Sequence, residues 1–223
     1  MSQNTLLFCF FGFGIVAVAA IVFLAIRGEQ ERTREMAYLA QRLGLEFFAK
    51  NWNGPRLPQQ FKTTLLQRTR GAYRNAMTGT FGGLAVFLFD YIHGQGKQRR
   101  THTMACFTQN VELAPFTLRP EGVLDRIGDR FVHSDIDFES YPEFSERYVL
   151  ESPEESATRK LFSPGLLSYF QQIPREKKWH VESAGINLIL YRPGLPVKVA
   201  QLELFLNEAS SIARAVFDSR HYN

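Results

Sequence analysis

One loop of the chain carries side chains suited to acid–base or anion-binding chemistry. Residues 90–97 hold Asp90, His93 and Lys97 together with two glycines. A carboxyl, an imidazole and an ammonium group in one loop are components of general acid–base catalysis on a polar or phosphorylated substrate. No helix is expected after the Gly-x-Gly-Lys pattern, so it lacks the context of a nucleotide phosphate loop. The structural alternative is a hairpin loop with solvated cations.

A second group of polar side chains surrounds Arg119 and Asp135. Arg119 lies where a predicted strand gives way to a predicted helix, and Asp135 opens an alternation of acidic and apolar residues. Carboxylates two residues apart on a strand lie about 7 Å from each other, too far to share one metal ion unaided. An ion pair of Arg119 with Asp135 or Asp137 is the structural interpretation, and a substrate clamp is the functional one. The candidate catalytic residues are Asp90, His93, Lys97, Arg119 and Asp135.

Other residue types point to no metal, cofactor or nucleic-acid site. The five histidines have no metal-ligand spacing, and the two cysteines, Cys9 and Cys106, form no disulfide framework. Basic residues are scattered, with no nucleic-acid recognition motif beside them. We therefore expect no metal ion, no cofactor and no nucleic-acid partner.

The elements that position these residues begin with an apolar segment, Leu6–Ile26. Its twenty-one residues carry no charge and reach about 31 Å as a helix, the thickness of a bilayer's hydrocarbon core. A cleaved signal peptide is the alternative, but no basic residue precedes the segment and its apolar run is too long. The sequence predicts one transmembrane anchor.

Basic residues follow the predicted span and set its orientation. Arg27, Arg32 and Arg34 lie just after it, and no basic residue lies before it. By the positive-inside rule the N-terminus faces out and the domain lies in the cytoplasm, at an inner (plasma) membrane.

Charge divides the rest of the chain. Residues 27–103 hold 13 Lys and Arg against 5 Asp and Glu, whereas residues 104–223 hold 13 against 17. A basic juxtamembrane half suits an anionic lipid surface, and ordinary solvated faces are the alternative. The candidate lipid-surface residues are Arg27, Arg32, Arg34, Arg68, Arg70 and Arg74.

Hydrophobic patterns predict an α+β fold: an antiparallel sheet with helices packed on it, behind the N-terminal transmembrane helix. A helix over 29–43 precedes the strands, and a C-terminal helix over 196–217 follows them. The predicted strands cover 73–80, 84–91, 99–109, 116–118, 131–138 and 147–150, with a hairpin over 179–191. The predicted divisions are a tail at 1–5, the span at 6–26, a juxtamembrane helix and connector at 27–71, and a domain at 72–223, with two halves meeting near 128 as the alternative.

From residue 75 onward the chain carries a series of short motifs, including Phe-Asp-Tyr at 89–91, Leu-Arg-Pro-Glu at 118–121 and Asp-Ile-Asp-Phe at 135–138. With these motifs the chain resembles an uncharacterised family of bacterial single-pass membrane-anchored proteins. The resemblance implies a bacterial inner-membrane location. The family has no assigned activity, so the resemblance assigns no functional residue.

The sequence favours a membrane-tethered cytoplasmic module that binds a protein partner or the lipid surface. The alternative is an enzyme acting on a membrane-proximal polar or phosphorylated substrate. Convergence of the five candidate catalytic residues in one pocket would favour the enzyme.

Overall fold

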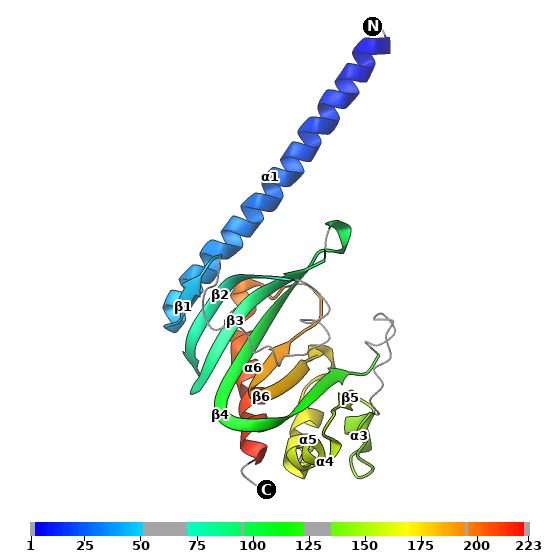
Figure 1. Cartoon of the computed structure of the whole chain (residues 1–223). Helices are drawn as coiled ribbons and strands as arrows, with labels where there is room; N and C mark the ends of the chain where they lie inside the picture. The colour runs from blue at the N-terminus through cyan, green and yellow to red at the C-terminus, as the bar shows by residue number, and fades with distance from the viewer. Residues whose placement is uncertain (1–2, 51–70, 95, 123–134, 195, 221–223) are drawn as a thin grey trace.

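A computed structural model describes residues 3–50, 71–94, 96–122, 135–194 and 196–220, and for residues 3–15, 17–19 and 97 it describes the backbone alone. The architecture is α+β, with one antiparallel sheet and helices packed on it (Figure 1). The strands are β1 (Glu46–Phe48), β2 (Ala72–Phe81), β3 (Leu84–His93), β4 (Arg100–Pro120), β5 (Tyr148–Glu151) and β6 (His180–Tyr191). The α-helices are α1 (Gln3–Leu43), α3 (Pro142–Ser145), α4 (Glu155–Leu161), α5 (Pro164–Gln172) and α6 (Leu202–Ser219), and the 3₁₀ turns are η1 (Gly96–Gln98), η3 (Arg175–Lys177) and η4 (Val199–Gln201).

The long strand β4 organises the sheet. Its first half pairs with β3 on one edge and β6 on the other, and its second half pairs with β5 and β6. Strands β2 and β1 extend the sheet beyond β3, and every pairing is antiparallel. Residues before and after 128 therefore share one continuous sheet.

Strand β3 shows why both faces of the sheet are apolar. Leu84, Val86 and Leu88 point toward the helices, whereas Phe89 and Tyr91 belong to a second buried cluster on the opposite face. Adjacent side chains of a strand point to opposite faces, so a continuously apolar run is typical of a strand covered on both sides. The Gly82-Gly83 turn that precedes it has positive φ at both residues (58° and 81°), which glycine adopts without steric cost.

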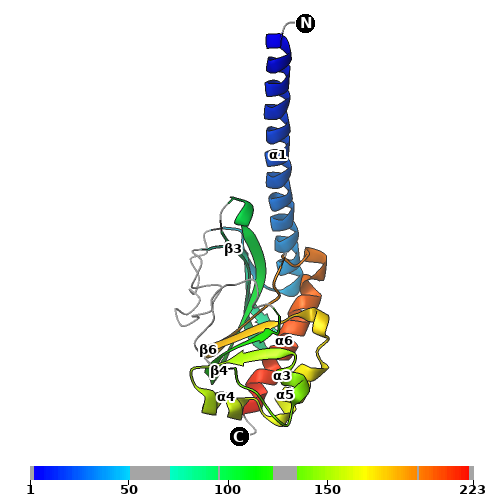
Figure 2. The same cartoon turned by 90° about the vertical axis from the view of Figure 1, so that its right-hand side faces the viewer.

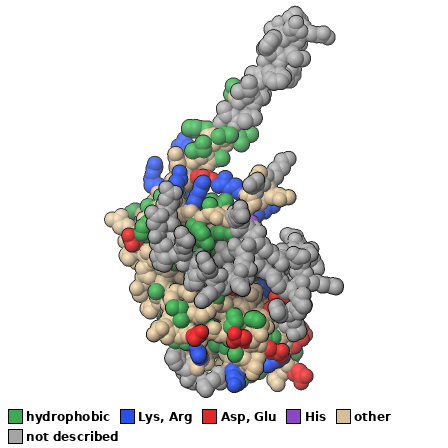
Figure 3. Space-filling view, viewed as in Figure 1, with side chains coloured by type: hydrophobic (Ala, Val, Ile, Leu, Met, Phe, Trp, Pro, Cys, Tyr) green, Lys and Arg blue, Asp and Glu red, His purple; other side chains and the backbone are tan. Residues whose placement is uncertain are grey.

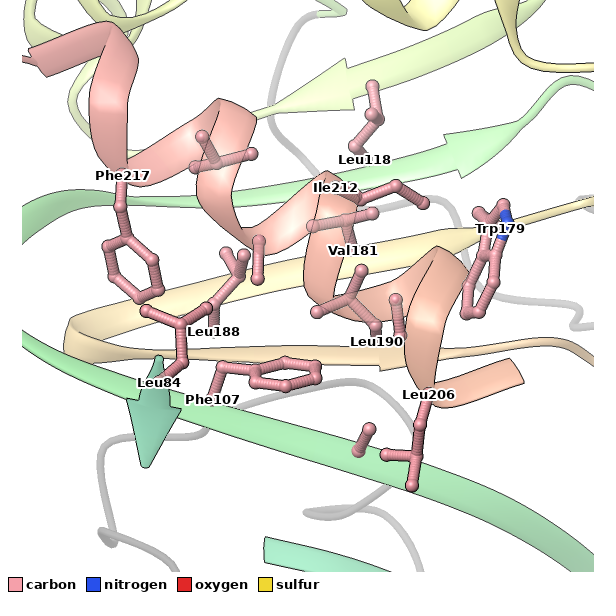
Figure 4. Packing of buried hydrophobic residues seen from close by; sticks show 14 of the residues in the cluster. Leu84, Phe107, Leu118, Trp179, Val181, Leu188, Leu190, Leu206, Ile212 and Phe217 are labelled. Atoms are coloured by element: carbon pink, nitrogen blue, oxygen red, sulfur yellow. The ribbon is translucent and has the colours of Figure 1, made fainter. Parts of the chain in front are cut away.

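Helix α6 covers one face of the sheet with an apolar stripe. Leu206, Ile212 and Phe217 project from it toward β4 and β6 (Figure 4). Trp179, fully buried just before β6, stacks obliquely on Phe205 with ring centroids 5.0 Å apart. Helix α5 packs against α6, α4 packs against β4, and α3 packs against α5 and β5, at the end of the domain away from the N-terminus (Figure 2).

Helix α1 is one continuous helix, and its C-terminal part, from Arg32 onward, belongs to the domain. Met36, Leu39 and Ala40 are buried against the sheet, and β1 pairs with β2 directly after it. The helix ends at Leu43, and the next residue, Gly44, has a positive φ of 69°, the conformation of a glycine C-cap. The segment predicted as a juxtamembrane connector thus contributes to the sheet and its core, and its residues 51–70 lie outside the described residues.

The N-terminal half of α1 extends away from the domain (Figures 1 and 2). Most of the predicted span, Leu6–Ile26, lies where the backbone alone is described. Among the described residues, no helix has both the length and the apolar character that crossing a bilayer requires.

Three predicted elements differ from the observed ones. The described part of the strand predicted over 131–138, residues 135–138, belongs to no strand of the sheet, and residues 131–134 lie outside the described residues. The hairpin predicted over 179–191 is a single strand, in which Gly185 has a positive φ of 59° and lies opposite Leu113 at a register shift. The strands predicted at 99–109 and 116–118 are one strand, β4, with irregularities between Thr108 and Phe116. At Gly185 the positive φ marks a bulge rather than a turn.

We expect residues 28–223 to fold without the preceding segment. This fragment keeps Met36, Leu39 and Ala40, the part of α1 that packs on the sheet. Expressed alone, it should give a mixed helix-and-strand circular dichroism spectrum and one cooperative thermal transition. An aggregated product or a disordered spectrum would show that residues 1–27 complete the core.

Candidate binding site between α1 and the sheet

Asp90 is the centre of a polar junction between α1 and the sheet. It lies on β3, on the helix-facing side, and is 1% exposed. Arg32 of α1 binds it with two parallel hydrogen bonds: Nε donates to Oδ2 and Nη2 to Oδ1, both at 2.8 Å. A bidentate arginine–carboxylate pair is strong and fixes the relative orientation of its partners. The pair therefore locks the helix onto the sheet.

Neighbouring groups satisfy the remaining acceptor positions of Asp90. Thr103 on β4 donates to Oδ1 at 3.0 Å, and Asn75 on β2 donates to Oδ2 at 3.0 Å. Thr33 of α1 in turn bonds the Asn75 side-chain oxygen at 2.9 Å. Asn75 has a positive φ of 51° at a register shift between β2 and β3. A left-handed backbone conformation costs energy for a residue other than glycine. At Asn75 this conformation accompanies a side-chain amide that points inward to Asp90.

The junction also holds the segment that leads into α6. Arg32 donates through Nη1 to the Val197 carbonyl at 2.7 Å, and the Val197 amide donates to the Thr103 hydroxyl at 3.0 Å. Asp90 thus accepts four hydrogen bonds from its surroundings. Because all its acceptor positions are used in internal hydrogen bonds, this buried carboxylate has a structural role and has no lone pair left for a substrate.

A pocket of about 610 Å³ lies beside the junction. Its walls come from α1, the end of β1, the start of β2, the end of β3 and the start of β4 with the residue before it, together with Pro196. It is lined by Ile26, Gly28, Glu29, Gln30, Arg32, Thr33, Arg34, Ala37, Phe47, Ala49, Lys50, Arg74, Asn75, Asp90, Ile92, Arg99, Thr101 and Pro196. We call it the basic pocket, because five of these residues are cations and two are carboxylates. Figure 3 shows basic side chains gathered where α1 meets the domain and acidic ones mainly toward its far end.

Glu29 bridges two of the arginines of the basic pocket. Its Oε2 lies 2.7 Å from Arg74 and its Oε1 lies 2.7 Å from Arg99. Arg74 is on β2 and Arg99 directly precedes β4, so two guanidinium groups far apart in the sequence converge on one anionic group. Within the described residues, no carboxylate pairs with Arg34 or Lys50.

A second polar cluster is buried on the opposite face of the sheet. Glu182 is 2% exposed and accepts a hydrogen bond from the Tyr191 hydroxyl at 3.1 Å. Burial raises the pKa of Glu182 to about 8. The ring of His180 stacks on Tyr191 at 4.8 Å, and burial lowers the pKa of His180 to about 3, with the nearby Arg119 adding to this. The cluster is therefore largely uncharged near neutral pH.

His102 extends this cluster toward His93. Their Nε2 atoms lie 3.0 Å apart. Burial, followed by the proximity of His93, lowers the pKa of His102 to about 4. Burial also lowers the pKa of His93 and raises that of the Cys106 thiol on the same face to about 12. Within the described residues, no three His, Cys, Asp or Glu side chains are placed to hold a metal ion.

The structure does not bring the candidate catalytic residues together. Asp90 faces α1, whereas His93 lies on the other face of the same strand beside His102. Arg119 pairs with Glu151 at 2.8 Å rather than with Asp135 or Asp137. Asp135 accepts a hydrogen bond from the Leu150 amide at 2.9 Å, and burial raises its pKa. Lys97 lies in η1, and its side chain is outside the described residues.

The candidate lipid-surface arginines also separate. Arg32 is committed inside the protein to Asp90, so it is not available to a lipid surface. Arg74 pairs with Glu29 in the basic pocket, while Arg27 and Arg34 are exposed. Arg68 and Arg70 lie outside the described residues.

Sequence reasoning missed Arg32 as the partner of Asp90, although a signal was present. Arg32 continues the apolar helical stripe of Met36, Leu39 and Ala40 at a spacing of four, seven and eight residues, and Asp90 continues the inward set of Leu84, Val86 and Leu88. A charged residue that continues an apolar stripe is buried with its element and needs a partner. Glu182 carries a similar signal, as an acid within the apolar β6.

Comparisons with known proteins give one informative likeness. No protein-family model and no curated protein matches this chain. A solved structure, "crystal structure of the mycobacterial trehalose monomycolate transport factor A, TtfA", is similar with a TM-score of 0.59 and 16% sequence identity. The match covers 84% of this chain and 93% of that one. At this identity the likeness establishes a shared α+β fold.

Proposed function

We propose that this chain is a membrane-tethered binding module that serves as an accessory factor in membrane transport. The N-terminal helix is its tether, and the domain lies in the cytoplasm. The observation that carries the proposal is the division of α1 into two parts. Its outer part exposes Val16, Ile21, Val22, Phe23, Leu24 and Ile26, and its inner part is fixed to the sheet by Arg32 and Asp90.

Exposed apolar side chains in such number need a covering environment. Contiguous apolar surface on a protein marks a membrane or protein contact, and the predicted span supplies the membrane interpretation. The rigid junction means that the bilayer would orient the whole domain rather than a flexible tail. The transport factor with the same fold supports an accessory role in transport. The enzyme alternative needs its candidate residues in one pocket, but Asp90 and His93 lie on opposite faces of β3, so the described geometry does not favour it.

Reporter fusions test this arrangement. We expect a periplasm-dependent reporter fused after Asn223 to be inactive and a cytoplasm-dependent one to be active, because the basic residues follow the span. Moving the charge should shift the topology: Gln3→Lys and Asn4→Lys combined with Arg27→Gln and Arg34→Gln should raise the periplasmic signal. Arg32 is left intact because it pairs with Asp90. Activity of the periplasmic reporter in the unmodified chain would contradict the proposed topology.

A further inference from the structure

We propose that the basic pocket binds the phosphate group of one anionic membrane lipid. The inference rests on the proposed function, because it requires the domain to lie at the bilayer surface. The pocket's volume of about 610 Å³ falls within the range of ligand pockets, roughly 300–1,000 Å³. It can therefore hold a headgroup with its glycerol rather than only an ion.

The position of the pocket suits a headgroup. Ile26, the last residue of the predicted span, and Gly28 both line it. If the span ends at Ile26, the mouth of the pocket lies at the depth of the lipid phosphates. Apolar wall residues, Ala37, Phe47 and Ile92 among them, offer a surface for the glycerol and the first methylenes.

The charge of the pocket favours an anion. Arg34 and Lys50 have no carboxylate partner within the described residues, whereas Arg32 is neutralised by Asp90. Glu29 already places a carboxylate between Arg74 and Arg99 at 2.7 Å from each. The two guanidinium groups are thus arranged to bind one oxyanion. A lipid phosphate would bind beside this clamp, and removal of the Glu29 charge would open it fully.

Native mass spectrometry of the full chain in dodecyl maltoside tests the inference, with phosphatidylglycerol and phosphatidylcholine added in equal amounts. We expect bound phosphatidylglycerol to exceed phosphatidylcholine by about tenfold, equivalent to about 1.4 kcal/mol. Arg34→Glu with Lys50→Glu should abolish this preference. Glu29→Gln should increase it, because Arg74 and Arg99 lose their internal anion.

Arg175→Glu with Arg220→Glu is the matched control, since it reverses two exposed cations that do not line the basic pocket. It should retain the preference. The inference would be overturned if both double variants lost the preference for phosphatidylglycerol equally, or if the unmodified chain showed no such preference. Displacement of the lipid by millimolar inorganic phosphate would overturn the lipid assignment. Membrane fractionation distinguishes the two proposals. If the chain is in the membrane fraction but shows no lipid preference, only the lipid-binding inference is contradicted. If the chain is outside the membrane fraction, the proposed function is contradicted.

Discussion

Asp90→Ala is expected to lower the free energy of unfolding by about 3–5 kcal/mol, the usual cost of breaking a buried ion pair. The substitution removes the acceptor of Arg32, Thr103 and Asn75. The side chain of Arg32 is 19% exposed, so water can replace the carboxylate only partly. Denaturant unfolding of the full chain in detergent, followed by circular dichroism, measures the loss.

An exposed ion pair provides the control. Glu155 and Arg159 lie one turn apart on α4, with side chains 51% and 41% exposed, so Glu155→Ala should change stability by less than about 0.5 kcal/mol. A double-mutant cycle with Arg32→Met should show strong coupling, because Met in place of Arg32 removes the unpaired charge. An Asp90→Ala effect no larger than that of Glu155→Ala would refute the role of the junction.

The regular part of the fold could be predicted from the sequence because its signals are local. The Gly82-Gly83 turn and the continuous apolar run after it predict β2 and β3, and an apolar stripe predicts α6. The sequence predicts two strands in place of β4, because the register shifts between Thr108 and Phe116 interrupt its pattern. The sequence predicts a turn at Gly185, because a glycine that favours positive φ is typical both of a turn and of a bulge. Whether the position is a turn or a bulge depends on which strands pair with each other, and a single sequence does not show the strand pairing.

The binding site was less predictable for the same reason. The basic pocket joins residues of α1, β2 and the segment before β4, and its clamp on Glu29 depends on how α1 docks. Net charge along the chain located the basic half, but it could not separate the buried Arg32 from the exposed Arg34. Helical spacing separates them, since Arg32 shares the stripe of Met36.

A large pH effect is expected from Glu182. Its pKa is about 8 in the folded protein because of burial, against about 4.3 for an unperturbed Glu in the unfolded chain. Between these values the folded state holds one proton that the unfolded state has released. Stability therefore falls as pH rises through this window, by up to about 1.4 kcal/mol per pH unit. Below this pH window Glu182 is protonated in both the folded and the unfolded state, so it no longer lowers the stability.

Histidines act in the opposite direction at lower pH. The pKa of His102 is about 4 and that of His180 about 3 in the folded protein, both below the unperturbed value of about 6.5. The unfolded chain binds these protons first, so stability is lost as pH falls below about 6.5. At acidic pH the two histidines therefore oppose the trend that Glu182 produces.

Glu182→Gln isolates the contribution of the carboxyl group, because both proteins contain the same histidines, whose effects on stability cancel in the difference. The amide keeps an oxygen for the Tyr191 hydroxyl but never ionises. The free energy of unfolding of the variant, relative to that of the unmodified chain, should therefore rise with pH, by about 4 kcal/mol between pH 5 and pH 8. Thermal unfolding of the full chain at half-unit pH steps measures this, with Glu143→Gln at an exposed position as the control. A pH-independent difference between Glu182→Gln and the unmodified chain would mean that Glu182 is ionised in the folded protein, and that the cluster on this face holds a buried charge.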